Sequence, residues 1–225
     1  MFPMTVPPGS LFERLRTACT ADWQAYVDHA FVRAMGAGTL PEASFRHYLG
    51  QDALFLIHFA RAYALAAFKA DTLDDIRAAG RGMTAILDEM GLHVAFCRRW
   101  GLSESALQAL PEARATLAYT RYVLERGLAG DVLDLFVALA PCVVGYAEIG
   151  RALAPLSHPG HPYAEWIDQY AGEAYQGVAA DAMATLDGLF ARRGGEGRMP
   201  ELIRTFRDAT RLEADFWEMG WTLAS

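Results

Sequence analysis

The sequence predicts an all-α protein, and three observations carry that prediction. Apolar residues recur at helical spacing through long segments, and each segment is interrupted at Gly, Pro or Ser. Segments with the alternating period of a β-strand are absent. Ala, Leu, Glu and Arg, which favour helices, are plentiful. We therefore expect about seven long helices in a single domain over residues 10–225, preceded by a flexible, proline-containing arm over residues 1–9.

The helices of the first half are delimited by capping residues and by glycine-rich breaks. Ser10 is a suitable N-cap for the first helix, because its hydroxyl can accept a hydrogen bond from the first turn. Pro41 suits the first helical position of the second helix, and Glu42 follows where the helix dipole favours an acidic side chain. The expected helices of this half cover residues 10–35, 41–68, 73–100 and 104–110.

The helices of the second half are delimited in the same way. Pro111 is expected to begin a helix, Asp131 to cap the next one, and Pro155 to follow its end. A glycine-rich turn at residues 194–197 then separates the last two helices. The expected helices of this half cover residues 111–128, 131–154, 162–193 and 200–223.

Composition and charge restrict the class of function. The net charge of −7 and the lack of a Lys- or Arg-rich block argue against nucleic-acid binding. The longest apolar stretch without charge, residues 135–147, is too short to span a membrane, and the first ten residues do not resemble a secretion signal. The three cysteines form no CxxC pair. We expect a cytoplasmic protein with no membrane partner.

Polar residues interrupt three apolar helix faces. Asp52, Glu213 and Cys142 each occupy the centre of a run spaced by three and four residues, and such a run lies on one face of a helix. The faces are Phe45, Tyr48, Asp52, Phe55 and Phe59; Phe206, Ala209, Glu213, Phe216 and Gly220; and Leu135, Ala138, Cys142, Tyr146 and Ile149.

A carboxylate within an apolar face loses its hydration, so it must find a partner, bind a ligand or remain protonated. A single case is as well explained by a buried, hydrogen-bonded structural group. Asp52 and Glu213 lie on separate helices, and both have aromatic neighbours. This pairing favours a ligand pocket, to which Tyr119, Tyr122 and the tyrosines of the sixth helix would add hydroxyl groups.

Cys142 follows Pro141 within an expected helix. Because proline has no N–H group, the helix should be perturbed there, and the perturbation can expose the thiol to a cavity. On these residues alone, a buried cysteine is more often a small apolar filler. Cys19 and Cys97 have charged neighbours but no acid or base partner in the sequence, and we interpret both as fillers.

Several runs of sequence resemble one family of helical enzymes, the TenA/thiaminase II family. The runs are FRHYLGQDALFLIHFAR at 45–61, LAPCVVGYAEIG at 139–150, HPYAEWIDQYAGEAY at 161–175 and LEADFWEMGW at 212–221. GTLPEASF and EMGLH match as well. The resemblance extends in order over nearly the whole chain, and the combination is specific although each motif alone is weak.

The resemblance implies a heme-oxygenase-like helical bundle that forms a homotetramer and uses no metal, heme or other cofactor. The implied reaction is hydrolysis of 4-amino-5-aminomethyl-2-methylpyrimidine to its hydroxymethyl counterpart, with slower cleavage of thiamine. By matching positions, Cys142 resembles the family's nucleophile and Glu213 its acid/base carboxylate. Asp52 resembles the residue that pairs with the ring nitrogen and the 4-amino group.

The resemblance also assigns the walls of the pocket. Tyr119 and Tyr170 match the family's pocket hydroxyls, and Tyr146 matches its stacking aromatic. Phe55 stands where some members have Tyr, so it can stack on a pyrimidine but cannot donate a hydrogen bond.

Three other functions remain open from the residues. Glu89 and His93, four residues apart, could both reach one metal ion and would suit an oxidase of the same fold, although the ExxH spacing of di-iron bundles is absent. A binding or regulatory protein for thiamine pyrimidines would not need Cys142 or Glu213. An oxidase of the quinone-cofactor type would require several His and Arg residues in its pocket.

Overall fold

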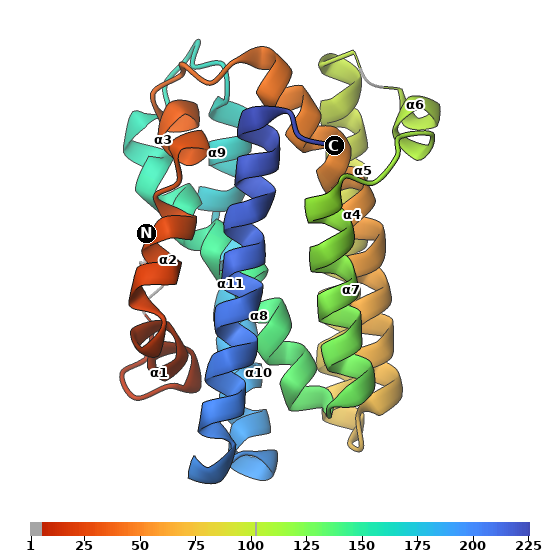
Figure 1. The fold of residues 1–225 in the computed structure, drawn as a ribbon, viewed down its shortest axis with the longest axis vertical. Helices are drawn as coiled ribbons and strands as arrows, with labels where there is room; N and C mark the ends of the chain where they lie inside the picture. The colour runs from red at the N-terminus through yellow and green to blue at the C-terminus, as the bar shows by residue number, and fades with distance from the viewer. Residues whose placement is uncertain (1–5, 102) are drawn as a thin grey trace. The chain divides into compact units, whose positions relative to one another are not determined.

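The computed structural model describes residues 6–101 and 103–225, without the side chains of residues 92, 93, 95, 96, 104 and 108. Within these residues the chain forms eleven α-helices and two 3₁₀ turns, and no strand (Figure 1). The all-α class predicted from the sequence is therefore confirmed. In chain order, the α-helices are α1 (Leu11–Ala18), α2 (Thr20–Val27), α3 (Ala30–Gly36), α4 (Glu42–Lys69), α5 (Leu73–Arg99), α6 (Glu104–Gln108), α7 (Arg114–Ala129), α8 (Val132–Leu153), α9 (Ala164–Ala171), α10 (Glu173–Arg193) and α11 (Met199–Thr222). The 3₁₀ turns cover Ala154–Leu156 and Glu196–Arg198.

The contacts within the chain group its residues into two compact units. The first unit comprises Met1–Leu40 and Phe136–Ala214, and the second comprises Pro41–Leu135 and Asp215–Ser225. Helices α8 and α11 contribute residues to both units. That residues 10–225 act as a single domain remains a prediction.

The second unit is built on the long helix α4, which packs along α5 and α7 (Figure 1). Lys69 ends α4 beside the end of α7, where its ammonium group donates to the carbonyls of Gly127 at 2.5 Å and Leu128 at 3.1 Å, and also to that of Gly130. These are carbonyls that the end of a helix leaves without an internal partner. Lys69 thus caps α7 and ties it to α4.

The first expected helix, over residues 10–35, is wrong in one respect. Ser10 is its N-cap, as predicted, and accepts from the N–H of Glu13 at 3.2 Å. The segment then divides into three short helices, with breaks at Cys19 and at residues 28–29. The second break is stabilised by His29, whose Nδ1 accepts from the N–H of Phe31 at 3.2 Å and so caps α3. An imidazole in this role carries no sequence signal of the usual kind.

The remaining expected boundaries agree with the structure to within two residues except at two places, and Pro41 is the N-cap of α4 instead of its first residue. The helix expected over 162–193 is divided at Gly172, whose extended backbone separates α9 from α10. The helix expected to begin at Pro111 begins instead at Arg114. Asp131 is a cap as predicted, and its carboxylate accepts from the N–H groups of Leu133 at 2.9 Å and Asp134 at 3.2 Å.

Helix α8 and the turn after it, Val132–Leu156, are apolar and long enough to cross a membrane by length and composition. However, 89% of the most apolar window of this segment is buried in the interior. The segment is a core helix, and its apolar side chains pack against the rest of the protein.

The end of α11 holds the one non-glycine residue with positive φ among the residues described, Leu223 at 58°. This left-handed residue allows the N–H of Ala224 to close the helix on the carbonyl of Met219 at 3.1 Å. Glycine adopts this conformation without steric cost. We expect Leu223→Gly to raise the free energy of unfolding by about 0.5–1 kcal/mol, measured by urea unfolding.

A matched control for this variant is Leu117→Gly. Leu117 is 40% exposed and Leu223 is 47% exposed, but Leu117 lies within α7. Glycine inside a helix is expected to lower the free energy of unfolding by about 1 kcal/mol. A decrease for both variants would show that Leu223 is not strained.

Candidate active site

Asp52 lies on α4 in the second unit and is 4% exposed. The hydroxyl of Tyr48, one turn earlier, donates to its Oδ2 at 3.4 Å. Burial raises the pKa of Asp52 to about 7, although the hydrogen bond from Tyr48 acts in the opposite direction. Near neutral pH this carboxyl group can therefore either accept or donate a proton.

Aromatic rings precede and follow Asp52 by one turn on α4, and they contact rings of α7 and α11. The ring of Phe55, one turn after Asp52, lies 5.0 Å from that of Tyr119 on α7 and 5.6 Å from that of Phe216 on α11, centroid to centroid. Tyr48 contacts the Phe216 ring edge-on at 6.1 Å. All four rings are buried. We call Tyr48, Asp52, Phe55, Tyr119 and Phe216 the Asp52 cluster.

Cys97 on α5 is a further neighbour of Asp52, which sequence reasoning missed. Its thiol is fully buried, and burial together with the charge of Asp52 raises its pKa to about 12. A thiol with this pKa is neutral at physiological pH, which argues against Cys97 as a nucleophile. Only the packing of α5 on α4 brings the two residues together, so no local pattern could have predicted it.

Cys142 lies on α8 in the first unit and is partly exposed, whereas Cys19 and Cys97 are buried. Tyr26 on α2 packs against the same helix: its hydroxyl donates to the carbonyl of Pro141 at 3.3 Å. A Cβ atom on Gly145 would lie 2.3 Å from the ring of Tyr26, so this approach requires glycine. Tyr26 thus contacts α8 at Pro141, just before Cys142, and at Gly145, just after it.

Tyr146 and Tyr170 form a second aromatic group in the first unit. Tyr146 lies on α8 one turn after Cys142, and Tyr170 lies on α9. Their ring centroids lie 4.9 Å apart with the planes at 63°, and Trp166 contacts both rings, at 5.8 Å and 4.5 Å. Trp166 carries no distinguishing pattern in the sequence and was missed. We call Tyr146, Trp166 and Tyr170 the Tyr146 cluster.

Two features fix α9 and α10 against α8 at this cluster. A Cβ atom on Gly150 would lie 2.5 Å from the backbone of Tyr170, so the helices can approach this closely only at glycine. The side-chain amide of Gln176 donates to the carbonyls of Ala147 at 2.9 Å and Tyr170 at 2.8 Å. Together they define the position of Tyr170 relative to Tyr146.

Glu213 is 2% exposed and lies on α11 in the first unit, as its apolar face predicts. Phe206 and Ala209, on the same face, are fully buried. Phe206 stacks on Trp23 of α2, with centroids 5.7 Å apart and the planes at 16°. Glu213 is therefore a buried carboxylate on a helix whose position is fixed by aromatic packing.

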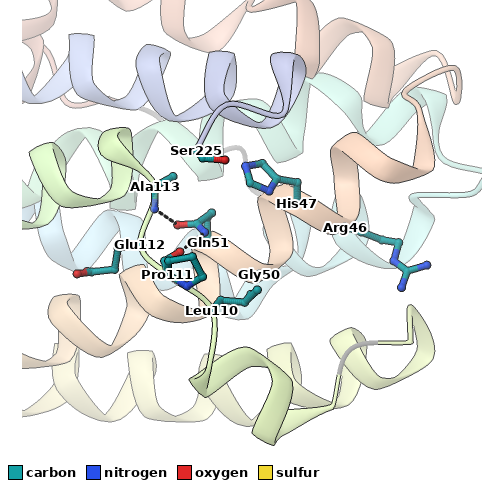
Figure 2. A pocket seen from close by; sticks show the side chains of 9 residues that line it. All are labelled: Arg46, His47, Gly50, Gln51, Leu110, Pro111, Glu112, Ala113 and Ser225. Carbon is teal, nitrogen blue, oxygen red and sulfur yellow. Dashed lines mark hydrogen bonds between the residues drawn. The ribbon is translucent and has the colours of Figure 1, made fainter.

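A cavity of about 380 Å³ lies elsewhere in the second unit, between the first half of α4, the segment before α7 and the end of the chain (Figure 2). None of the residues that line it is among the seven site residues predicted from the sequence. Its lining residues are Arg46, His47, Gly50, Gln51, Leu110, Pro111, Glu112, Ala113 and Ser225.

The structure distributes the predicted site residues over both units. Asp52, Phe55 and Tyr119 belong to the second unit and come together in the Asp52 cluster. Cys142, Tyr146, Tyr170 and Glu213 belong to the first unit, where Tyr146 and Tyr170 are in contact. Glu89 and His93 of the metal alternative lie on α5, but the side chain of His93 is outside the described residues.

The second unit thus holds a buried carboxyl group with aromatic neighbours, and the first unit holds a partly exposed cysteine and a group of aromatic rings, both in an all-α chain. The chain matches the TENA/THI-4/PQQC family over residues 17–223, and it belongs to that family.

Several proteins resemble the chain over almost its whole length. The aminopyrimidine aminohydrolase of Halalkalibacterium halodurans is 36% identical over 95% of this chain and 94% of the relative. That of Bacillus subtilis is 30% identical, over 93% and 89% of the two chains. The crystal structure of a TenA family transcription regulator from Silicibacter sp. TM1040 is 45% identical with a TM-score of 0.92, covering 96% of this chain and 98% of that one.

Proposed function

We propose that the chain is a hydrolase that converts 4-amino-5-aminomethyl-2-methylpyrimidine to the hydroxymethylpyrimidine and cleaves thiamine more slowly. The observation that carries the proposal is the Asp52 cluster, because a carboxyl group with a pKa of about 7 suits the ring nitrogen and 4-amino group of an aminopyrimidine. The names of the two aminohydrolase relatives support the same reaction. The aromatic side chains of the cluster suit the faces of the ring.

In the proposed reaction Cys142 adds to the pyrimidine as a thiolate, and Glu213 protonates the ring nitrogen that receives the electron pair. The carbon–nitrogen bond of the arm then breaks, and ammonia leaves. Water adds to the exocyclic carbon, and the thiolate departs as the ring is restored. The overall change replaces an amino group by a hydroxyl group, with no oxidant or reductant.

The remaining roles follow the family resemblance. Asp52 binds the amidine edge, Phe55 and Tyr146 stack on the ring, and Tyr119 and Tyr170 supply hydroxyl groups. The proposal requires no metal ion or organic cofactor. It includes a cytoplasmic location, which the three free cysteines support, and no nucleic-acid or membrane partner.

The proposed assembly is a homotetramer. Large apolar side chains on the surface of the second unit support association, since Phe68 is 86% exposed and Leu128 is 68% exposed. Light scattering of the purified protein measures the mass directly. A monomeric mass of 24.7 kDa would contradict the tetramer without affecting the proposed reaction.

The proposed reaction is tested by incubating the purified protein with the aminomethylpyrimidine, and separately with thiamine. The hydroxymethylpyrimidine is followed by chromatography with mass detection. Rapid product from the first and slow product from the second are expected. Tight binding of the pyrimidine without product from either would contradict hydrolysis and favour a binding or regulatory protein.

Glu213→Gln is expected to lower kcat by about 100-fold or more, with little change in KM. Glutamine keeps the shape of the side chain but cannot transfer a proton. Because Glu213 is buried, the free energy of unfolding must be measured alongside. A folded variant with normal kcat would remove Glu213 from the acid/base role.

A further inference from the structure

Gln51 lies beside Asp52 on α4, and its side chain is 3% exposed. Its amide nitrogen donates to the carbonyl of Pro111 at 3.0 Å. Its amide oxygen accepts from the N–H of Ala113 at 2.9 Å and from the hydroxyl of Thr116 at 2.7 Å. Figure 2 shows the amide of Gln51 between Pro111 and Ala113. One side chain of α4 thus holds the loop before α7 and the first turn of α7.

These hydrogen bonds serve as one half of a capping box at the start of α7, where a capping side chain at the N-cap is missing. Ala113 stands at the N-cap position and has no side chain that could cap the helix. In a capping box, the side chain of the fourth residue reaches back to the N–H of the N-cap residue. Here the oxygen of Gln51 takes that N–H, and Thr116, the residue at the fourth position, joins the same oxygen. The cap is therefore supplied by another helix.

A cap supplied by α4 fixes where α7 lies as well as where it begins. Tyr119 follows Thr116 by one turn, and Phe55 follows Gln51 by one turn, so the contact between the two rings at 5.0 Å lies directly beyond the cap. Asp52 is next to Gln51 in the chain and belongs to the same cluster as both rings. The amide of Gln51 is thus a polar connection between the helix that carries Asp52 and the start of the helix that carries Tyr119.

Glutamine is well suited to this task. A primary amide can donate to one carbonyl and accept two hydrogen bonds on its oxygen, and Gln51 does both while buried. Leucine has a similar size but can make none of the three bonds. It would leave the N–H of Ala113 and the carbonyl of Pro111 without their partner.

We propose that Gln51 is a positioning residue for substrate recognition: it holds Tyr119 in register with Asp52 and so sets the KM for the aminopyrimidine. This rests on the proposed function. The effect is exerted through the placement of α7, and Gln51 itself makes no contact with the substrate.

The proposal is tested with Gln51→Leu, assayed with 4-amino-5-aminomethyl-2-methylpyrimidine. We expect KM to rise about 10-fold, which corresponds to one lost hydrogen bond, with kcat within about twofold of the original chain. Thr120→Val is the matched control: Thr120 is buried on α7, but its hydroxyl bonds only within that helix among the hydrogen bonds described, to the carbonyl of Thr116 at 2.7 Å and from the guanidinium of Arg121 at 2.8 Å. Its KM should be unchanged.

A second variant separates positioning from stability. Ala113→Ser gives α7 a capping side chain of its own. Gln51→Leu should lower the thermal stability, because it removes buried hydrogen bonds, and adding Ala113→Ser should recover much of that loss. The raised KM should remain, because α7 is still not tied to α4. Recovery of KM together with stability would overturn the positioning role and leave Gln51 as a cap alone.

A double-mutant cycle with Tyr119→Phe identifies the residue through which Gln51 acts. If Gln51 acts by placing the hydroxyl of Tyr119, Gln51→Leu should raise KM little further once that hydroxyl is absent. The proposal would be overturned if the KM increases of the two single variants simply multiplied in the double variant. An unchanged KM in Gln51→Leu itself would overturn it as well. A wild-type chain without turnover would instead refute the proposed function, so the two failures are distinguishable.

Discussion

Replacement of Cys142 by serine is expected to lower kcat for the aminomethylpyrimidine by about 10⁴-fold or more. A serine hydroxyl has nearly the size of the thiol, but it is a far weaker nucleophile at neutral pH and adds poorly to a carbon–nitrogen double bond. Binding of the pyrimidine, measured by calorimetry, should remain within about threefold, because the assigned ring contacts belong to other residues. Chromatography with mass detection provides the rate.

The control for Cys142→Ser is Cys19→Ala. Cys19 is buried in the same unit, and burial raises the pKa of its thiol although Arg207 beside it acts in the opposite direction. Its sulfur makes a weak contact with the carbonyl of Ile203 at 3.7 Å. Its removal should leave kcat unchanged. Full turnover by Cys142→Ser would exclude covalent catalysis by this residue while leaving hydrolysis itself possible.

The faces of single helices could be predicted from the sequence because they depend only on spacing. The face of Asp52 is buried as predicted, and the contact from Tyr48 to Asp52 is a contact between successive turns of one helix. The pairing of Phe55 with Tyr119 depends on how α4 packs against α7. Spacing contains no information on that packing, and only the family resemblance placed both residues in one site.

Two of the errors in the fold arise where one segment supplies the cap of another or where an unusual residue caps a helix. Pro111 is a strong local signal for a helix start, yet the hydrogen bonds from Gln51 hold Pro111 and Ala113 outside the helix. His29 caps α3 with an imidazole nitrogen. In both cases the partner that decides the boundary cannot be recognised from the local sequence, so propensity alone gives the wrong start.

Asp52→Ala is expected to lower kcat/KM for the aminomethylpyrimidine by about 10³-fold, mainly through KM. The change removes the only carboxyl group of the Asp52 cluster, and with it two hydrogen bonds to the amidine edge in the proposed complex. Asp52→Asn should lose less, because its amide can accept from the 4-amino group and donate to the ring nitrogen. Equal losses in the two variants would contradict direct recognition of this edge.

The same pair of variants tests the environment of Asp52 without substrate. The pKa of Asp52 is about 7 in the folded chain, above the value of about 3.9 expected when the chain is unfolded, so the folded state binds this proton more tightly. Its contribution to stability is fully present below pH 4 and is lost as the pH rises through 7. The free energy of unfolding should therefore fall by up to about 4 kcal/mol across this range relative to Asp52→Asn, which has no titrating group there. Parallel pH profiles for the original chain and Asp52→Asn, obtained by urea unfolding, would show that the carboxyl group is not held neutral by burial. The recognition of the pyrimidine would then have to rest on an ionised Asp52 at neutral pH.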